Sequence, residues 1–507
     1  MKKNMKKYFL IAFATVLFSS CGDEFLTVEN PTQDPIEDYY TTLPHLQEAM
    51  VSAYCPMHWT DWSMSQYNPL LIMSDIMADQ IWVGGADATD NKYWHEMMNY
   101  SADPKNCMTS IWTDAYSGVK RCNDVFTYLE WTKAAGNIDD EAAKSYQAQT
   151  YLLRAYYYTW LWKFWGNVVY YDKNLESPFI GTQYTADEVY SFIISDLDKC
   201  IALIDALPMK RADDEVGYVS QAVVYMLYAE VVLYQKDTAK YANALSYLRQ
   251  IISSGEYDLY DYSKLFTLEG EWCCESIWEV GYKTDGQVRS YDNVLAAGGT
   301  ILPRLIGAYN LKTNTEGHAA GWGFCPVRKE TYDSFSATDV RRKATCFDAS
   351  GYDYEKRYQD TGYFLEKYQG STVDESAGDG APDMRFGNNL RLYRYSETLL
   401  YAAELALATG SDAAEAKGWL NKVHSRAGLT DELELTLANI QKERALEFVG
   451  EGKRYWDLIR WDLAQTVLVP DTYGYRTNAW DATRKYLPIP STEIDAAQGT
   501  LKQNENY

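Results

Sequence analysis

The sequence predicts a mainly α-helical protein, a tetratricopeptide-like α-superhelix with a loop-rich ligand-binding region and a few short strands. Apolar residues recur every three or four positions through about 106–265 and 390–466, a period typical of amphipathic helices. The stretches 56–105 and 268–389 lack this period and are rich in aromatic residues and glycine. Long stretches without helical period more often form functional surfaces than packed cores, so we expect the ligand to bind there.

Residues 1–20 have the features of a signal peptide, and Cys21 follows them directly. Four lysines precede an apolar run, Tyr8–Phe18, which is about half the ~20 residues that a membrane-spanning helix needs. Two serines then precede the cysteine, an arrangement similar to a bacterial lipobox, in which the cysteine is acylated. We therefore expect Cys21 to carry lipid and the acidic, proline-containing residues 21–40 to form a flexible tether. A plain signal peptide with an incidental cysteine is the alternative.

The body, residues 41–507, is predicted to be a single unit of antiparallel helix pairs. A short helix is expected at 43–54 and a long one at about 106–130. The next helix, which runs from capping acids near Asp139 to Phe164, is aromatic on all sides, and this predicts burial against several neighbours. Alanines along the helices permit the close approach typical of tetratricopeptide units of about 34 residues. The helical repeats cover 41–55, 106–265 and 390–466, with further helices at 186–207, 220–235, 239–253, 392–409, 413–427, 437–449 and 455–466 and a strand at 277–282.

Composition and charge argue against several classes of ligand. The formal net charge of −24 repels nucleic acid and anionic lipid headgroups, so we expect neither as a ligand. After the first 20 residues no segment approaches 18 uninterrupted apolar residues, which places the body outside the bilayer. The nine cysteines show no zinc-finger spacing, and positions such as Cys55, Cys122 and Cys200 are expected to be buried thiols, with disulfides as the alternative. The abundant tyrosines (44) and tryptophans (16) suit protein cores, sugar rings and peptide backbones alike.

The sequence has no recognisable catalytic or metal-binding motif, so we expect a non-catalytic protein without a metal or cofactor. Its five histidines are isolated, and G-x-S-x-G, Walker and dinucleotide-binding motifs are absent. Asp75 and Asp79 lie one helical turn apart near Trp82, and they allow three interpretations: a hydrolytic pair, acceptors for sugar hydroxyls, or a solvated helix face. The acidic loops around 374–383 could bind a structural calcium ion, although no EF-hand spacing is present.

Aromatic residues in the two irregular regions are the candidate ligand site. Trp82, Tyr93 and Trp94 offer flat faces for stacking on a sugar ring, and Trp322 would close the site from the second region. Each tryptophan alone is more typical of a protein core, but the neighbouring glycines at 84–85 and in 321–323 favour an exposed shelf. The polar candidates and further contacts are Asp79, Asn91, Arg289 and Tyr291.

Six stretches spread along the chain carry recognisable motifs. They are Asp23–Thr32, Trp112–Asn123, Leu153–Tyr158 with Trp165–Val168, Arg394–Glu404, Glu443–Trp461 and Tyr486–Ile494. In this order they resemble the SusD/RagB family of surface lipoproteins. We expect the charged residues of these motifs to be architectural, with Arg154 reaching a carboxylate or a helix end and Arg444 pairing with a carboxylate nearby.

The resemblance implies a non-catalytic lipoprotein at the outer-membrane cell surface, anchored in outer-membrane lipid through acylated Cys21. It further implies an α-superhelix overlaid by a loop-rich ligand face. Such a protein would capture an oligosaccharide and deliver it to a partner, a SusC-like TonB-dependent β-barrel transporter. The alternatives are a peptide-binding, RagB-like member of the same family, a protein-interaction scaffold, and an enzyme.

Overall fold

The computed structural model describes residues 35–284, 289–376 and 380–507. The architecture is mainly helical, as predicted, and the described residues include three two-stranded antiparallel sheets. Cys21 and the predicted signal peptide lie outside the described residues. Within those residues, no helix combines the length and apolar character needed to cross a membrane.

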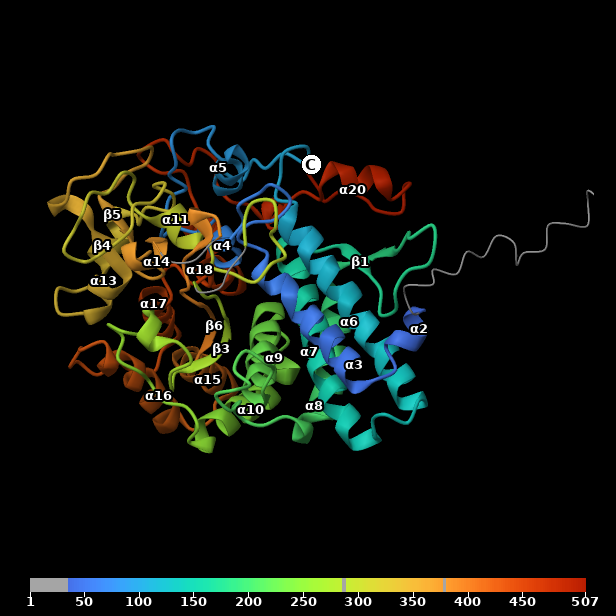
Figure 1. Cartoon of the computed structure of the whole chain (residues 1–507). Coiled ribbons are helices and arrows are strands. Elements are labelled where there is room, and N and C mark those ends of the chain that lie inside the picture. Colours follow the sequence, from blue (N-terminus) through green and yellow to red (C-terminus); the bar gives the residue numbers. More distant parts are fainter. Residues whose placement is uncertain (1–34, 285–288, 377–379) are drawn as a thin grey trace, which may run out of the picture.

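Antiparallel helices form one side of the molecule and continue along its base (Figure 1). The predicted helices are confirmed in position to within a few residues at most ends. They are α3 (Leu43–Tyr54), α6 (Ser110–Ala134), α7 (Asp140–Trp165), α8 (Ala186–Ile201), α9 (Gln221–Gln235), α10 (Tyr241–Ser254), α15 (Tyr395–Thr409), α16 (Ala413–Arg426) and α17 (Leu437–Glu447).

Helix α7 lies at the centre of this helical side. Its N-terminus is capped by Asp139, whose carboxylate accepts a hydrogen bond from the backbone N–H of Ala142, and it ends at Gly166. Most of its residues after Ala148 are buried, which confirms the predicted burial on several faces. Gly118 on α6 permits the close approach, because a Cβ atom there would lie 2.4 Å from the ring of Tyr157.

Three predicted helices were wrong in extent. Helix α8 ends at Ile201 rather than at 207, because a turn and the short 3₁₀ helix Ile204–Ala206 follow it. Helix α15 begins at Tyr395 rather than at Leu392, because the preceding residues form strand β6 (Leu390–Arg394), which pairs with β3 (Ser276–Val280). The helix predicted at 455–466 is two, α18 (Arg454–Arg460) and α19 (Ala464–Val467), separated at Asp462, whose φ is 58°.

The two irregular regions lie together on the other side of the molecule, where short helices and strands are connected by long loops (Figure 1). The strands β4 and β5 form one small sheet here, whereas β1 and β2 lie beside the long helices. The short elements are α2 (Ile36–Tyr39), α4 (Leu70–Asp75), α5 (Lys92–Met98), α11 (Leu302–Ile306), α12 (Lys329–Ser334), α13 (Val340–Thr345), α14 (Thr372–Ser376), α20 (Ser491–Ala496), β1 (Val168–Tyr170), β2 (Thr182–Tyr184), β4 (Cys346–Asp348) and β5 (Tyr363–Leu365).

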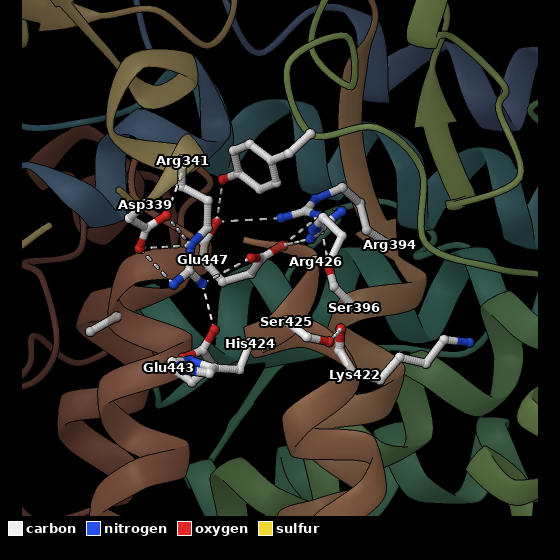
Figure 2. A network of polar contacts seen from close by, with 12 residues as sticks. Asp339, Arg341, Arg394, Ser396, Lys422, His424, Ser425, Arg426, Glu443 and Glu447 are labelled. Carbon is white, nitrogen blue, oxygen red and sulfur yellow. Dashed lines mark hydrogen bonds and ion pairs between the residues drawn. The ribbon is translucent and has the colours of Figure 1, made fainter. Parts of the chain in front are cut away.

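A buried network of ion pairs fastens the loop-rich side to the helices (Figure 2). Arg341 on α13 contacts Glu443 (Nη1–Oε1, 2.6 Å) and Glu447 (Nη1–Oε2, 3.3 Å) on α17. Glu447 also pairs with Arg394, at the end of β6, and with Arg426 on α16. Burial would raise the pKa of Glu447, but the surrounding guanidinium groups outweigh it and hold this pKa at about 2.

The charged residues of the sequence motifs are architectural, as predicted. Arg154 is 3% exposed and makes a bidentate ion pair with Asp196 at 2.7 and 2.9 Å. Arg444 pairs with Asp457 (Nε–Oδ2, 2.8 Å) and with Glu397 (Nη2–Oε1, 3.1 Å). Both guanidinium groups are buried inside the protein and are paired with its own carboxylates.

The cysteines of the described residues are all free thiols. Cys122 and Cys200 are buried, as predicted, whereas Cys55 is only half-buried. Burial raises the pKa of the Cys55 thiol, and the nearby Arg121 opposes this only in part.

Candidate functional site

Four partly exposed aromatic residues form a continuous surface that we call the aromatic platform: Trp62, Tyr67, Tyr291 and Trp322. The rings of Trp62 and Tyr67 lie 4.6 Å apart, centroid to centroid, and Trp322 meets Tyr67 edge-on at 5.4 Å. Tyr291 meets Trp62 edge-on at 5.1 Å. The platform therefore joins the two irregular regions, and Tyr67 and Tyr291 are more than 200 residues apart in the sequence.

Tyr67 is held from beneath by two residues that the sequence suggested as ligand contacts. Its backbone carbonyl accepts hydrogen bonds from the hydroxyl of Tyr93 (3.2 Å) and from Nε1 of Trp94 (3.1 Å), and both donors also reach Oδ1 of Asn68. Trp94 is fully buried and Tyr93 is 7% exposed. Their faces are thus enclosed in the core, and the structure gives them a positioning role under the platform instead of a stacking role.

Trp322 is presented by a closely packed glycine segment. Its backbone N–H donates to the carbonyl of Arg304 (2.8 Å), and its own carbonyl accepts from Nη1 of Arg357 (2.7 Å). A Cβ atom on Gly321 would lie 2.4 Å from the backbone of Gly307, so only glycine fits there. Of the exposed shelf expected at 321–323, Gly321 and Gly323 are buried in a segment that pairs with its neighbours, and only the Trp322 side chain is partly exposed.

Polar groups border the platform on the side of Tyr291. The Tyr291 hydroxyl donates to Oδ2 of Asp383 (2.9 Å), and Oδ1 of Asp383 contacts Nε of Arg304 at 2.9 Å. Nε1 of Trp62 donates to the carbonyl of Tyr291 (3.3 Å). Burial raises the pKa of Tyr67, and the negative charges of Asp383 and Asp90 add to this effect, so the Tyr67 hydroxyl stays protonated and can donate.

Two other candidates from the sequence are enclosed by charged partners. Trp82 is 2% exposed, and the guanidinium of Arg328 lies 3.5 Å above its ring centroid. Arg289 is also 2% exposed and is bound by both carboxylate oxygens of Asp61, next to Trp62. Neither side chain faces the platform surface, and Arg289 instead fixes the loop that carries Tyr291.

The paired aspartates and Asn91 also have structural surroundings. Asp79 makes a bidentate ion pair with Arg454 at 2.8 and 2.9 Å, and Asp75 is buried and accepts from the backbone N–H of Gly452. Burial raises the pKa of Asp75 to about 7. Asn91 is half-buried and precedes α5 with a φ of 49°. Of the three interpretations of the aspartate pair, none describes what the structure shows, because Asp75 holds the backbone just before α18 and Asp79 pairs with Arg454, the first residue of that helix.

The platform offers aromatic faces bordered by hydrogen-bonding groups, which suits a flat, hydroxyl-bearing ligand better than a reaction. In the described residues no group of three or more histidine, cysteine, aspartate or glutamate side chains could hold a metal ion. The platform residues also include no pair of carboxylates facing each other across a cleft, as glycoside hydrolysis requires.

The sequence interpretation missed Trp62 and Tyr67. They flank a short turn in which Met64 and Ser65 both have positive φ (51° and 59°) and are exposed. Ser63, Ser65 and Gln66 between the two aromatic residues were the available signal for this turn.

Comparisons with known proteins agree with this fold and surface. A profile of the SusD family matches residues 337–507, and a second profile, described as "Starch-binding associating with outer membrane", matches residues 30–231. The structure of surface glycan-binding protein A from Bacteroides thetaiotaomicron is 52% identical, with a TM-score of 0.88 over 92% of this chain and 100% of the other. The chain belongs to the SusD/RagB family.

Two further solved structures support the assignment of this chain to the SusD/RagB family. Surface glycan-binding protein A from Bacteroides uniformis is 43% identical, with a TM-score of 0.83 over 91% of this chain and 99% of its own. A structure titled "Laminarin binding SusD-like protein" is 27% identical, with a TM-score of 0.81 over 92% of this chain and 100% of its own. The protein from B. thetaiotaomicron has also been solved in complex with laminarihexaose. All three are named as binding proteins and none as an enzyme, and the family is associated with the outer membrane.

Proposed function

We propose that this SusD-like protein binds a glycan on the aromatic platform, without altering it, at the cell surface. The observation that carries the proposal is the surface itself: four aromatic side chains from two distant segments meet, are partly exposed, and are held by hydrogen bonds beneath them. Such a preformed surface binds at a low cost in conformational entropy, because its side chains are already ordered.

A laminarin-type glucan is the ligand that we propose. The protein from B. thetaiotaomicron, at 52% identity, has been solved with laminarihexaose, and a second relative is titled laminarin binding. Sugar rings stack on aromatic faces through their C–H groups, while hydroxyls need acceptors and donors at the edge. Asp383 and the hydroxyl of Tyr291 supply both kinds of group at one border of the platform.

Affinity electrophoresis in gels that contain different polysaccharides tests this proposal. We expect laminarin to retard the wild-type protein. Trp322→Ala should weaken binding about tenfold or more, because truncating a central aromatic contact costs about 2 kcal/mol and each ~1.4 kcal/mol is a factor of ten. Trp131→Ala is the matched control, since Trp131 is also a partly exposed tryptophan but lies on α6. Lack of retardation by any glycan, together with peptide binding in calorimetry, would favour the peptide-binding alternative.

We also propose that acylated Cys21 anchors the protein in the outer membrane and that a SusC-like transporter is its partner. The sequence before the described residues supports the anchor, because a short apolar run is followed by two serines and the cysteine. Cys21→Ala should move the protein from the membrane fraction to the soluble fraction. Co-purification of a β-barrel with the wild-type protein from detergent extracts tests the partner, and its absence under mild extraction would argue against it.

A further inference from the structure

A second group of aromatic residues lies outside the platform, and we call it the second shelf: Tyr358, Tyr473 and Tyr475. Tyr473 is exposed, and the other two are half-buried. Tyr473 is 54% exposed, and its ring is stacked on that of Tyr475 (5.9 Å between centroids, 14° between planes). Tyr475 in turn meets Tyr358 at 5.4 Å. Nothing in the proposed platform accounts for these three rings.

The loop that carries Tyr473 and Tyr475 is firmly held. The carboxylate of Asp471 accepts hydrogen bonds from the backbone N–H groups of Tyr473, Tyr475 and Arg476. The guanidinium of Arg476, 1% exposed, donates to the carbonyls of Met98, Met77 and Ala78 in the core. The edge of the buried Trp82 supports both tyrosine rings from below. An exposed aromatic pair on a fixed loop is a preformed surface, like the platform.

The second shelf and the platform are connected through three segments joined by backbone hydrogen bonds. The segment that follows Trp322 pairs with 81–85, through hydrogen bonds from Gly85 N to Gly323 O and from Cys325 N to Val83 O. The backbone carbonyl of Gly85 in turn accepts a hydrogen bond from the backbone N–H of Tyr358. The Tyr358 segment also lies beside the Trp322 segment directly, because a Cβ atom on Gly323 would be 3.1 Å from Cδ of Arg357.

Two charged side chains lie between the aromatic groups. Arg357 crosses from the Tyr358 segment to the carbonyl of Trp322, and its guanidinium lies over the ring of Tyr309 at 4.0 Å. Asp90 lies beside Gly85, where a Cβ atom would be 3.0 Å from Oδ2 of Asp90. The gap between the two aromatic surfaces therefore contains a donor and an acceptor of the kind that hydroxyl groups need.

We propose that the second shelf binds further sugar residues of the same glycan chain that the platform binds, so that affinity grows with chain length. This inference rests on the proposed glycan-binding function. The platform takes one part of the chain, Arg357 and Asp90 lie along the intervening hydroxyls, and the stacked pair Tyr473 and Tyr475 takes the next rings. A short oligosaccharide occupies the platform alone and gains nothing from the second shelf.

Isothermal titration calorimetry with laminaritriose, laminarihexaose and laminarin tests this inference on the full mature chain. The wild-type protein should bind laminarin more tightly than the trisaccharide. Tyr473→Ala and the double variant Tyr473→Ala/Tyr475→Ala should lower laminarin affinity about fivefold to tenfold and leave trisaccharide affinity within twofold of the wild-type value. Trp131→Ala is again the control, and thermal unfolding establishes that each variant is folded.

The outcomes separate the two proposals. If the second-shelf variants bind laminarin as tightly as the wild type does, or lose affinity for the trisaccharide and the polymer equally, the second shelf is not a distal binding surface. If Trp322→Ala binds every sugar normally, or the wild type binds none of them, the platform function fails. Should the double variant not fold, the single variant Tyr473→Ala decides, because the Tyr473 side chain is more than half exposed and makes one hydrogen bond, to Glu330.

Discussion

Replacing Arg341 with methionine should destabilise the protein strongly, because this side chain is the cation that connects the loop-rich side to the helices. Arg341 is fully buried and contacts Asp339, Glu443 and Glu447, which are 1%, 2% and 0% exposed in their side chains. Methionine preserves much of the side-chain volume and removes the charge. Three carboxylates then share fewer cations in a poorly solvated site (Figure 2).

Removing one partner of a buried ion pair typically costs about 3–5 kcal/mol, since the remaining charge stays desolvated. The unfolding entropy of a body of this size is about 1 kcal/mol/K, so this loss corresponds to a fall in Tm of about 3–5 °C. Differential scanning calorimetry at pH 7 measures the shift. The control is Lys120→Met, because Lys120 makes an exposed ion pair with Asp124 (Nζ–Oδ2, 2.8 Å) that is worth at most about 1 kcal/mol.

The pH dependence distinguishes lost charge pairing from lost packing. The folded-state pKa of Glu447, about 2, lies below its unfolded value of about 4.3, so its pairing stabilises the protein above the unfolded pKa. This stabilisation is lost as the pH falls through the folded pKa. The difference between wild type and Arg341→Met should therefore be greatest at pH 7 and should narrow between about pH 4 and 2. A shift no larger than that of Lys120→Met, or one that is constant with pH, would refute the electrostatic explanation.

Two further predictions concern the same network and the platform. The carboxylate of Glu443 accepts a hydrogen bond from His424 and raises the pKa of this histidine, and Asp431 contributes to the shift. The pairing therefore stabilises the protein fully below pH ~6.5 and is lost as the pH rises through the higher folded pKa. His424→Gln should lower Tm more at pH 6 than at pH 9, and equal shifts would contradict this. Gly321→Ala should weaken laminarin binding by displacing Trp322, because the new Cβ would lie 2.4 Å from the Gly307 backbone. The control is Gly418→Ala on α16, where nothing lies within 4 Å of the new Cβ. This control should bind laminarin normally and gain up to about 1 kcal/mol of stability. Calorimetry measures the laminarin affinity and the Tm of both glycine variants. Unchanged binding by Gly321→Ala would contradict the proposal that Gly321 positions Trp322.

The helices could be predicted from the sequence because their information is local. Caps, apolar period and terminal glycines placed α3 and α7 to within a residue or two of their ends. The start of α15 could not be placed in this way, since the apolar residues of Leu390–Arg394 fit either a helix or a strand. The choice of strand depends on pairing with β3, more than 100 residues earlier in the chain.

The candidate site could be predicted only to the level of its regions. Trp82 and Trp94 have local surroundings much like those of Trp322, with glycines or turn residues beside them. What separates them is tertiary: Trp94 is covered by Phe324 of the Trp322 segment, whereas Trp82 is covered by Arg328 and contacts Tyr475 from a distant loop. No local pattern reports which of two paired segments becomes the outer one. The aromatic composition was therefore informative, whereas the choice among the aromatic residues was not.

The motifs that identify the family and the residues that contact the ligand serve separate physical purposes. The motif residues Arg394, Glu443 and Glu447 lie in the buried network, which fixes where the loops leave the helices and strand β6. The platform residues lie on those loops and contribute little to the network, so a change of Trp322 alters the ligand surface while the ion pairs stay intact. Changing the network, in contrast, disturbs the ends of the loops and with them every residue that they carry. This separation explains how a chain can be assigned to the family from its motifs while its ligand has to be established at the platform and the second shelf.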